Sequence, residues 1–288
     1  MIFDVITDTL SDALKLLPFL FVTYFVMEYI EHKAGNKAEQ MIQKAGRFGP
    51  LLGSMLGIFP QCGFSAAASS LYAGRIITLG TLISIFLSTS DEMLPIFISE
   101  QVPVVTILKI LGVKVLIGMA AGFVIDLVIR KKRSESLKHE HLKIEEMCNH
   151  QHCHCAEGKI LKSALSHTMQ IFFFIILISF VLNLLIGIIG EDSLAGILSG
   201  KPILGPLLSG IVGLIPNCAA SVILTQLYLE GLLSAGSMIA GLLVGAGVGQ
   251  LVLFKVNDDF GENVKITVIL YAIGVISGMI IETAGLVF

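Results

Sequence analysis

The sequence predicts an all-α polytopic membrane protein made of two inverted-topology repeats, each containing a Pro-broken helical hairpin. Three observations support this prediction: an apolar composition, an internal repeat and two basic loops. Of the 288 residues, 55% are hydrophobic and 14% are charged, and the mean hydropathy is +0.86. Soluble domains are about 25% charged, so this chain has too little polar material to coat a soluble globule. The expected architecture has about eight full spans plus two hairpins, nominally ten transmembrane segments.

The composition also excludes several classes of protein. A cytosolic enzyme would need more polar surface, and a nucleic-acid binder would need a basic surface that a net charge of −3 does not supply. Disorder is excluded because disordered chains have low hydrophobicity. We therefore expect a lipid bilayer as the environment, no nucleic-acid partner and no enzymatic activity.

Apolar stretches follow one another along the chain, and a helix needs about 20 apolar residues to cross the hydrocarbon. Uninterrupted stretches of this kind lie at residues 13–31, 76–98, 104–129, 168–189, 232–254 and 264–287. Two more, 48–74 and 203–230, are interrupted at Pro60 and Pro216, which leaves only about a dozen apolar residues on each side of the break. Each is predicted to form a re-entrant hairpin. The alternative is that each stretch crosses the membrane twice as two short complete spans. Either arrangement adds an even number of membrane crossings.

The chain is predicted to be an internal duplication with an offset of 156 residues. Residues 49–129 and 205–285 share 19 identities in 81 positions without a gap, where roughly one in ten is expected for apolar stretches. The informative identities are Gly49/Gly205, Pro50/Pro206, Gly57/Gly213, Pro60/Pro216, Cys62/Cys218, Ser65/Ser221, Tyr72/Tyr228, Gly80/Gly236, Gly118/Gly274 and Gly122/Gly278. The predicted organisation is a membrane repeat at residues 1–130, a His/Cys-rich cytoplasmic linker at 131–162 and an inverted membrane repeat at 163–288.

The basic residues predict which way the two halves face. Twelve of the 19 Lys and Arg residues lie in segments 32–47 and 130–162. Basic loops stay in the cytoplasm, so both segments are expected on the cytoplasmic side of the plasma membrane, and both termini on the outer side. An even number of crossings must separate these loops, and 76–98 and 104–129 supply two. The segment 48–74 then crosses twice or not at all, so the halves are inverted, as they are in many secondary transporters.

The hairpin tips are predicted to bring polar groups into the membrane. Non-helical backbone is tolerated at this depth only where protein buries it or where it lines a cavity. The returning helix would present its partially positive N-terminus, which favours an anion or a thiolate. The candidate substrate-binding residues at the two tips are Gln61, Cys62, Ser65, Asn217, Cys218 and Ser221. The alternative interpretation is that each motif only makes a tight turn around a buried Cys.

Ser90, Asp91 and Glu92 lie deep within the predicted span 76–98 and complete the predicted substrate site. Acidic residues within a membrane are costly, and by default they mark an ion or proton pathway. The alternative is that this segment lies near the outer interface, because only a short apolar remainder follows it.

Three further charged residues lie in predicted spans. Asp126 and Glu282 occupy matching positions near helix ends, where they are either solvated or contribute weakly to coupling. Lys114 is nominally in the middle of a span, where it either pairs with an acid or extends to the interface.

A second metal-binding region is predicted in the linker. Its thiol and imidazole side chains are Cys148, His150, His152, Cys153, His154 and Cys155. Such ligands suit Zn²⁺, Cu⁺ and similar metals, although the spacing does not predict a fixed tetrahedral site. The linker would capture or sense a metal, and the alternative is a flexible connection with incidental His and Cys. No cofactor is required, and the expected metal is a substrate or a loop-bound ion.

The segment GIFPQCGFSAAASSLYAGRIITLGTLISIFLSTSDEMLP (57–95), with GLIPNCAAS (213–221) as its partner, resembles a bacterial family of ten-span heavy-metal exporters. Members are labelled arsenic efflux proteins or manganese transporters. The resemblance covers nearly the whole chain except 131–160, and it implies export from the cytoplasm across the plasma membrane. The sequence contains no nucleotide-binding motif, so we expect coupling to an ion gradient, with protons as the first candidate.

The residues leave two substrate classes open. Cys62 and Cys218 suit a thiophilic species such as a trivalent arsenical, whereas the oxygen ligands of Asp91 and Glu92 suit a harder cation such as Mn²⁺. A rival function is a membrane thiol-disulfide electron carrier that uses Cys62 and Cys218. A homodimer is also left open.

Overall fold

The computed structural model describes residues 48–58, 62–90, 93–133, 204–216 and 218–286, together with isolated helical positions between 17 and 25 and between 165 and 180. All regular secondary structure in these residues is helical. The linker cluster and most of the predicted spans 13–31 and 168–189 lie outside the described residues.

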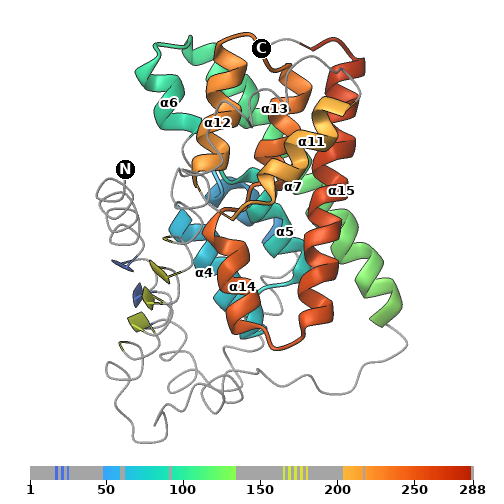
Figure 1. Ribbon diagram of the computed structural model, residues 1–288. Coiled ribbons are helices and arrows are strands. Elements are labelled where there is room, and N and C mark those ends of the chain that lie inside the picture. Colours follow the sequence, from blue (N-terminus) through green and yellow to red (C-terminus); the bar gives the residue numbers. More distant parts are fainter. Residues whose placement is uncertain are drawn as a thin grey trace, which may run out of the picture.

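Ten helices follow one another in two sets of five within the five continuous described segments (Figure 1). The first half comprises α3 (Gly49–Leu56), α4 (Cys62–Ala73), α5 (Leu79–Ser88), α6 (Met93–Ser99) and α7 (Val104–Arg133). The second half comprises α11 (Leu204–Gly213), α12 (Cys218–Leu229), α13 (Ala235–Val244), α14 (Val248–Val256) and α15 (Phe260–Thr283). At the offset of 156 residues, α12 has the bounds of α4 and α13 has the bounds of α5.

Matching residues begin and end these matching helices. The side chains of Thr78 and Ser234 cap α5 and α13, and each accepts a hydrogen bond from the backbone N–H three residues later, at 3.1 and 3.2 Å. The chain leaves α4 through Arg75 and α12 through Gly231, which have φ angles of +59° and +73°. This left-handed closure usually takes glycine, so Arg75 holds a backbone conformation that is unfavourable for its side chain.

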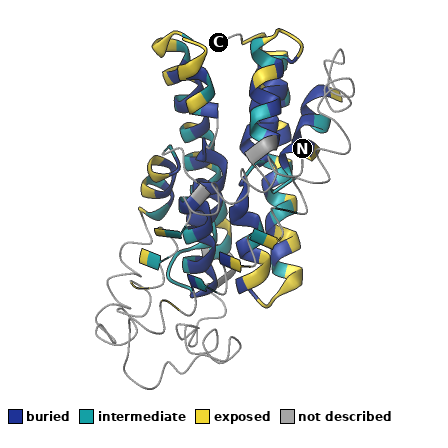
Figure 2. Ribbon diagram, turned by 60° about the vertical axis from the view of Figure 1, so that its left-hand side comes forward, coloured by how far each residue is buried: buried dark blue, intermediate teal, exposed yellow. Residues whose placement is uncertain are grey.

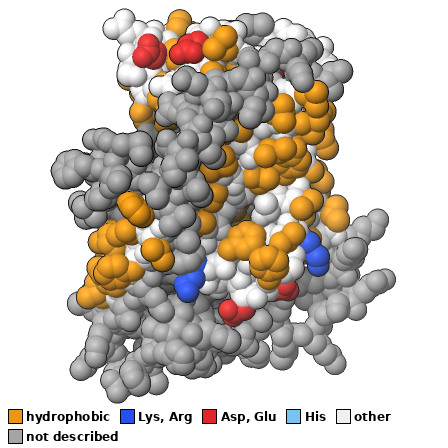
Figure 3. Space-filling view, in the orientation of Figure 1, with side chains coloured by type: hydrophobic (Ala, Val, Ile, Leu, Met, Phe, Trp, Pro, Cys, Tyr) orange, Lys and Arg blue, Asp and Glu red, His pale blue; other side chains and the backbone are white. Residues whose placement is uncertain are grey.

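Within the described residues, four helical segments are long and apolar enough to cross a membrane. The segments Leu79–Ser99 and Ala235–Val256 are 75% and 83% buried, whereas Val104–Ile129 and Phe260–Thr283 are 28% and 33% buried. The first two therefore form the core of a multi-pass membrane protein, and the other two expose apolar faces suited to lipid. Figure 2 shows exposed residues gathered at the two ends of the bundle, and Figure 3 shows apolar side chains along its side.

Glycines let the outer helices pack directly on the backbones of the inner helices. A Cβ on Gly80 of α5 would lie 2.2 Å from the carbonyl oxygen of Gly122 on α7. In the second half, a Cβ on Gly236 of α13 would lie 2.5 Å from the carbonyl oxygen of Gly278 on α15. Small residues at such contacts permit the close helix packing that is common in membranes.

The predicted spans 76–98 and 232–254 are each interrupted, which the sequence analysis did not predict. The described residues Thr89 and Ser90 follow the end of α5 without helical structure, and residues 245–247 separate α13 from α14. Hydroxyl side chains in the first break bond to backbone carbonyls and compete with the helix. In the second break Gly247 has a φ of +52° and a ψ of −136°, a conformation that L side chains rarely adopt.

The short helices of the two halves pack against each other in exchanged pairs. In Figure 1, α4 and α14 lie toward the lower end of the bundle, and α6 and α12 lie toward the upper end. At the lower end Ser69 Oγ donates a 2.6 Å hydrogen bond to the carbonyl oxygen of Gly249. At the upper end the rings of Phe97 and Tyr228 lie 6.4 Å apart. Each end is thus built from one helix of each half.

Candidate functional site

The first break lies inside the protein, next to the end of α3. Thr89 and Ser90 are each 2% exposed. The hydroxyl of Thr89 donates to the carbonyl oxygen of Ile85 at 2.7 Å, and the hydroxyl of Ser90 donates to that of Ile58 at 2.6 Å. The hydroxyl of Ser90 therefore connects the break to the residue that precedes the predicted hairpin tip. Such a buried, non-helical segment at membrane depth is the setting in which transporters build ligand sites.

Lys114 connects the first break to the second half. Its side chain is fully buried, and its ammonium donates to the carbonyl oxygen of Thr89 and to that of Leu242, the latter at 3.1 Å. Of the two alternatives left by the sequence, extension to the membrane interface is excluded, because the ammonium lies in the core of the bundle. A positive charge at this depth is energetically costly and points to a functional role.

The start of α14 lies directly against the predicted substrate residue Ser65. Ser65 on α4 is fully buried, and a Cβ on Gly249 would lie 2.6 Å from the Cβ of Ser65. Gly249 follows the second break by two residues. A residue of the first predicted tip therefore packs beside the break of the opposite half, and this contact requires glycine at position 249.

The structure describes the predicted site residues to different extents. Ser65 and Ser90 are buried and Ser221 is half-buried. Cys62 and Cys218 are the first helical residues of α4 and α12, and their side chains are outside the described part. Also outside it are Gln61, Asn217, Asp91, Glu92, Cys148, His150, His152, Cys153, His154 and Cys155. Among the residues that the structure describes, no group of three or more His, Cys, Asp or Glu side chains could hold a metal ion.

Gln250 is a buried polar residue near the second break that the sequence analysis missed. It lies in the first turn of α14 and is 5% exposed. Within the described part of the chain, its side-chain nitrogen has no hydrogen-bond partner. A buried amide N–H of this kind is costly unless another group accepts from it, so Gln250 is a candidate hydrogen-bond donor to a bound substrate.

Asp126 is neither solvated nor at a free helix end, contrary to one of the two interpretations of the sequence. It is 9% exposed, and its carboxylate accepts hydrogen bonds from the backbone N–H of Gly80 at 2.9 Å and from Thr78 Oγ1 at 2.8 Å. The carboxylate thus compensates the partially positive N-terminus of α5. Glu282 lies at the matching place, since a Cβ on Gly236 would lie 2.5 Å from its carboxylate oxygen.

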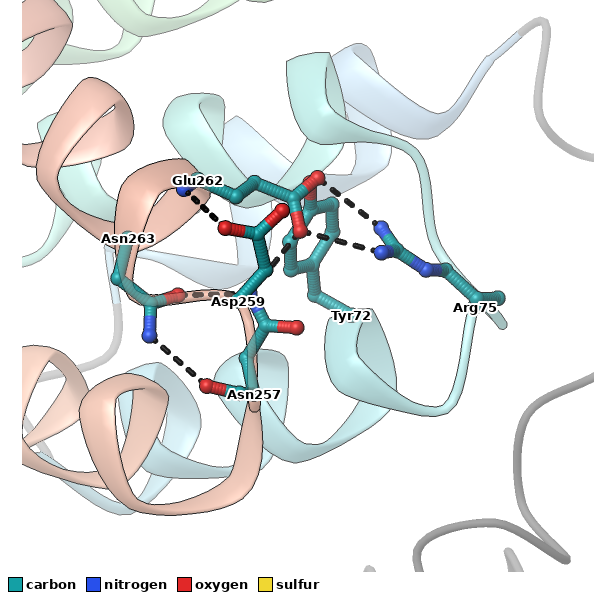
Figure 4. Close-up of polar contacts among 6 residues, drawn as sticks. All are labelled: Tyr72, Arg75, Asn257, Asp259, Glu262 and Asn263. Carbon is teal, nitrogen blue, oxygen red and sulfur yellow. Dashed lines mark hydrogen bonds and ion pairs between the residues drawn. The ribbon is translucent and has the colours of Figure 1, made fainter.

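One end of the bundle carries an ion pair between the halves (Figure 4). Both terminal nitrogens of Arg75, which follows α4, donate to the carboxylate of Glu262 on α15, at 3.2 and 3.1 Å. The hydroxyl of Tyr72 donates to the same carboxylate at 2.6 Å, and the amide of Asn257 donates to it at 3.0 Å. Three side chains therefore donate hydrogen bonds to one acid.

The surroundings of Glu262 hold this carboxylate in place. The side chain of Asp259 caps α15, because it accepts a 2.9 Å hydrogen bond from the backbone N–H of Glu262. The Asn257 amide also donates to the side-chain oxygen of Asn263 at 2.6 Å, as the geometry in Figure 4 shows. Burial lowers the pKa of Arg75, but the hydrogen bonds and the charge of Glu262 raise this pKa by more, so its net shift is upward. Arg75 is therefore charged at physiological pH.

A comparison with known families identifies the type of protein. A family model described as "Putative, 10TM heavy-metal exporter" matches residues 2–192 of the 288. The chain belongs to this family. The match confirms the resemblance carried by residues 57–95. No curated protein and no solved structure matches the chain.

For a heavy-metal exporter, the described metal-ligand atoms around the breaks are oxygen atoms of hydroxyls and backbone carbonyls. Sequence reasoning missed Gln250 and left the role of Lys114 open. Both residues could have been identified from the repeat, because each is polar and has an apolar residue at the matching position 156 residues away. Leu270 stands at the position of Lys114, and Leu94 stands at the position of Gln250.

Proposed function

We propose that this member of the heavy-metal exporter family is a secondary-active exporter that moves a metal ion or a metalloid out across the plasma membrane. Its substrate site lies at the two hairpin tips near the midplane, beside the two helix breaks, and proton exchange drives the transport. Family membership supports metal export in general terms. The observation that carries the proposal is the matched pair of interrupted spans, because discontinuous helices in corresponding positions of two halves line the substrate sites of many secondary transporters.

The two halves are proposed to be inverted repeats. The coincidence of helix bounds at one offset supports a duplication, and the placement of α4 and α12 toward opposite ends of the bundle supports inversion. A count of ten transmembrane segments follows if the six predicted full spans are added to the two hairpins, each counted twice. This reading reduces the number of full spans from about eight to six.

The orientation follows from the basic loops. Segments 32–47 and 130–162 are cytoplasmic in this proposal, and both termini are outside. The end that carries Arg75 and Glu262 is then cytoplasmic, and the opposite end, with Gly231, faces outside. The His/Cys cluster of the linker would capture a metal on the cytoplasmic side before transport.

The proposed substrate ligands come from both halves. Gln61, Cys62, Ser65, Ser90, Asp91 and Glu92 belong to the first half, and Asn217, Cys218 and Ser221 belong to the second. Gln250 is added because its amide is buried beside the second break. The two cysteines would carry a thiophilic metalloid, whereas the acids and amides would carry a harder cation such as Mn²⁺.

A flux assay in proteoliposomes tests this proposal. The purified protein is assayed with a panel of divalent metals and trivalent arsenicals, with and without a pH gradient. We expect uptake into inside-out vesicles for one substrate class. A pH gradient with the acidic side in the vesicle lumen should accelerate this uptake. Asp91→Asn should reduce the flux of a hard cation by at least about tenfold, because an ionised ligand is lost.

The two cysteine variants distinguish the substrate classes. Cys62→Ser and Cys218→Ser should abolish arsenical flux if the site is soft, and should leave Mn²⁺ flux within about twofold if it is hard. Ser99→Ala, which removes an exposed hydroxyl at the end of α6, serves as the control. Absence of flux for every metal and arsenical would contradict the proposal.

A second candidate function rests on the positions of the two cysteines. Cys62 and Cys218 each begin a helix at matching places, where a helix N-terminus stabilises a thiolate. A membrane thiol-disulfide electron carrier would alternate this pair between faces. Thiol trapping after mild oxidation would then detect a Cys62–Cys218 disulfide, and failure to trap it would remove this candidate.

A further inference from the structure

Lys114 lies near the middle of the span Val104–Ile129, and its side chain is fully buried. A lysine in a membrane usually extends its long side chain toward the interface. Here the side chain turns into the bundle, where its ammonium donates to the carbonyl oxygens of Thr89 and Leu242. These two acceptors belong to different halves and lie 153 residues apart in the sequence.

Both acceptors are at the C-terminal ends of broken helices. The last four carbonyls of a helix have no partner within it, and the helix dipole makes this end partially negative. Thr89 is the C-cap residue of α5. Leu242 lies in the last turn of α13, and the N–H of Ala246, which would be its ordinary helical partner, instead donates to the carbonyl of Val244 at 2.9 Å. One ammonium therefore satisfies one helix end from each half.

The position that matches Lys114 in the second half carries no charge. Leu270, at the matching position of α15, is fully buried and apolar. The Lys114 ammonium thus serves both broken helices. In other transporters with discontinuous helices, carbonyls at such half-helix ends coordinate the coupling cation.

We infer that Lys114 is a built-in cation: its ammonium occupies the place that a small monovalent cation would otherwise take between the C-terminal ends of α5 and α13. In this role it is a positioning residue, since it fixes the spacing of the two breaks through Thr89 and Leu242. Its effect on transport rests on the proposed function, whereas its effect on stability does not. Shortening the side chain would leave a site for Na⁺ or a primary alkylammonium.

The test is thermal unfolding of purified variants in detergent, at constant ionic strength, with choline, Na⁺ or propylammonium as the cation. We expect Lys114→Ala to lower the melting temperature by roughly 5 °C or more in choline, because two buried acceptors lose a charged donor. Na⁺ or propylammonium should restore most of this loss. Lys114→Met should show the loss without the rescue, since its side chain fills the space, and Lys114→Arg should retain most of the stability.

The matched control is Lys109→Ala, because Lys109 is an exposed lysine on the same helix. It should melt like the wild type in all three salts. In the flux assay, Lys114→Met should lower the maximal rate by about tenfold with little change in KM, and Lys114→Arg should recover part of it.

Three results would overturn the inference. The first is a wild-type melting temperature for Lys114→Met. The second is an equal decrease in melting temperature for Lys114→Arg and Lys114→Met. The third is a decrease in the melting temperature of Lys114→Ala that neither Na⁺ nor propylammonium reduces. If Lys114→Ala folds only when propylammonium is present during purification, the inference is supported. A wild-type protein without metal flux would remove the proposed function and leave the cation-dependent melting untouched, so the two failures are distinguishable.

Discussion

The two halves of the molecule share their backbone design and differ in where they carry charge. In both, a hydroxyl caps the inner helix, and a glycine pair brings the outer helix onto it. In both, an acid on the outer helix, Asp126 or Glu282, lies against the glycine at the start of the inner helix. These shared residues determine packing, so a duplicated chain preserves them.

Several differences between the halves are polar, and three of them carry the comparison. Lys114 is matched by Leu270, Arg75 by Gly231, and Glu262 by Thr106. In the first half Lys114 compensates the broken helices, and at one end of the bundle Arg75 binds Glu262. The comparison teaches that shared positions maintain the fold, whereas unmatched charges are where function and asymmetry should be sought.

The largest expected effect comes from the shared glycine contact. Gly122→Val should destabilise the protein by about 3 kcal/mol or more, because its Cβ would lie 2.5 Å from the carbonyl oxygen of Gly80 and 2.8 Å from the Cβ of Pro50. Gly278→Val in the second half should behave alike. The measurement is the melting temperature and monodispersity on size-exclusion chromatography.

Gly112→Val is the control on the same helix. No atom of the described chain lies within 4 Å of a Cβ placed there, so its effect should stay within about 1 kcal/mol. Equal losses of stability for Gly112→Val and Gly122→Val would contradict the claim that the close approach of α5 and α7 stabilises the protein.

The next effect concerns the shared acid. Asp126→Ala should cost about 2 kcal/mol, because the backbone N–H of Gly80 and the hydroxyl of Thr78 lose a charged acceptor. Flux per folded molecule should remain within about twofold if the role is structural. Full stability with lost flux would instead assign Asp126 to coupling.

The smallest effect separates charge from backbone strain at position 75. The free energy of unfolding of Arg75→Gly should lie within about 1 kcal/mol of the wild-type value. The variant loses a partly exposed ion pair, but glycine relieves the strain of the positive φ of 59°. Arg75→Ala keeps the strain and loses the ion pair, so it should be about 1 kcal/mol less stable than Arg75→Gly. Chemical denaturation in detergent measures the difference, and a glycine variant that is less stable than the alanine variant would refute this explanation.

Much of the fold follows from local sequence signals. Apolar runs, the two interrupting prolines and the offset of 156 predict the order of helices and place Cys62 and Cys218 at matching sites. The breaks that begin at Thr89 and Gly245 were not predicted, since a hydroxyl-rich or Gly-rich segment in an apolar run is compatible with a continuous span.

The site depends on contacts that a local pattern cannot reveal. The Lys114 ammonium bonds to a residue 128 positions later, and Arg75 pairs with one 187 positions later. Periodicity identifies the face of a helix that is buried, but it does not identify the partner that a buried charge finds across the bundle.

The claim at the centre of this account is that the two halves are inverted, and one measurement tests it most directly. In a background without native cysteines, Ile76→Cys and Leu232→Cys place thiols at matching positions after α4 and α12. A membrane-impermeant maleimide should label Leu232→Cys in intact cells and Ile76→Cys only in inside-out vesicles. Labelling of both thiols from the same side of the membrane would contradict the account.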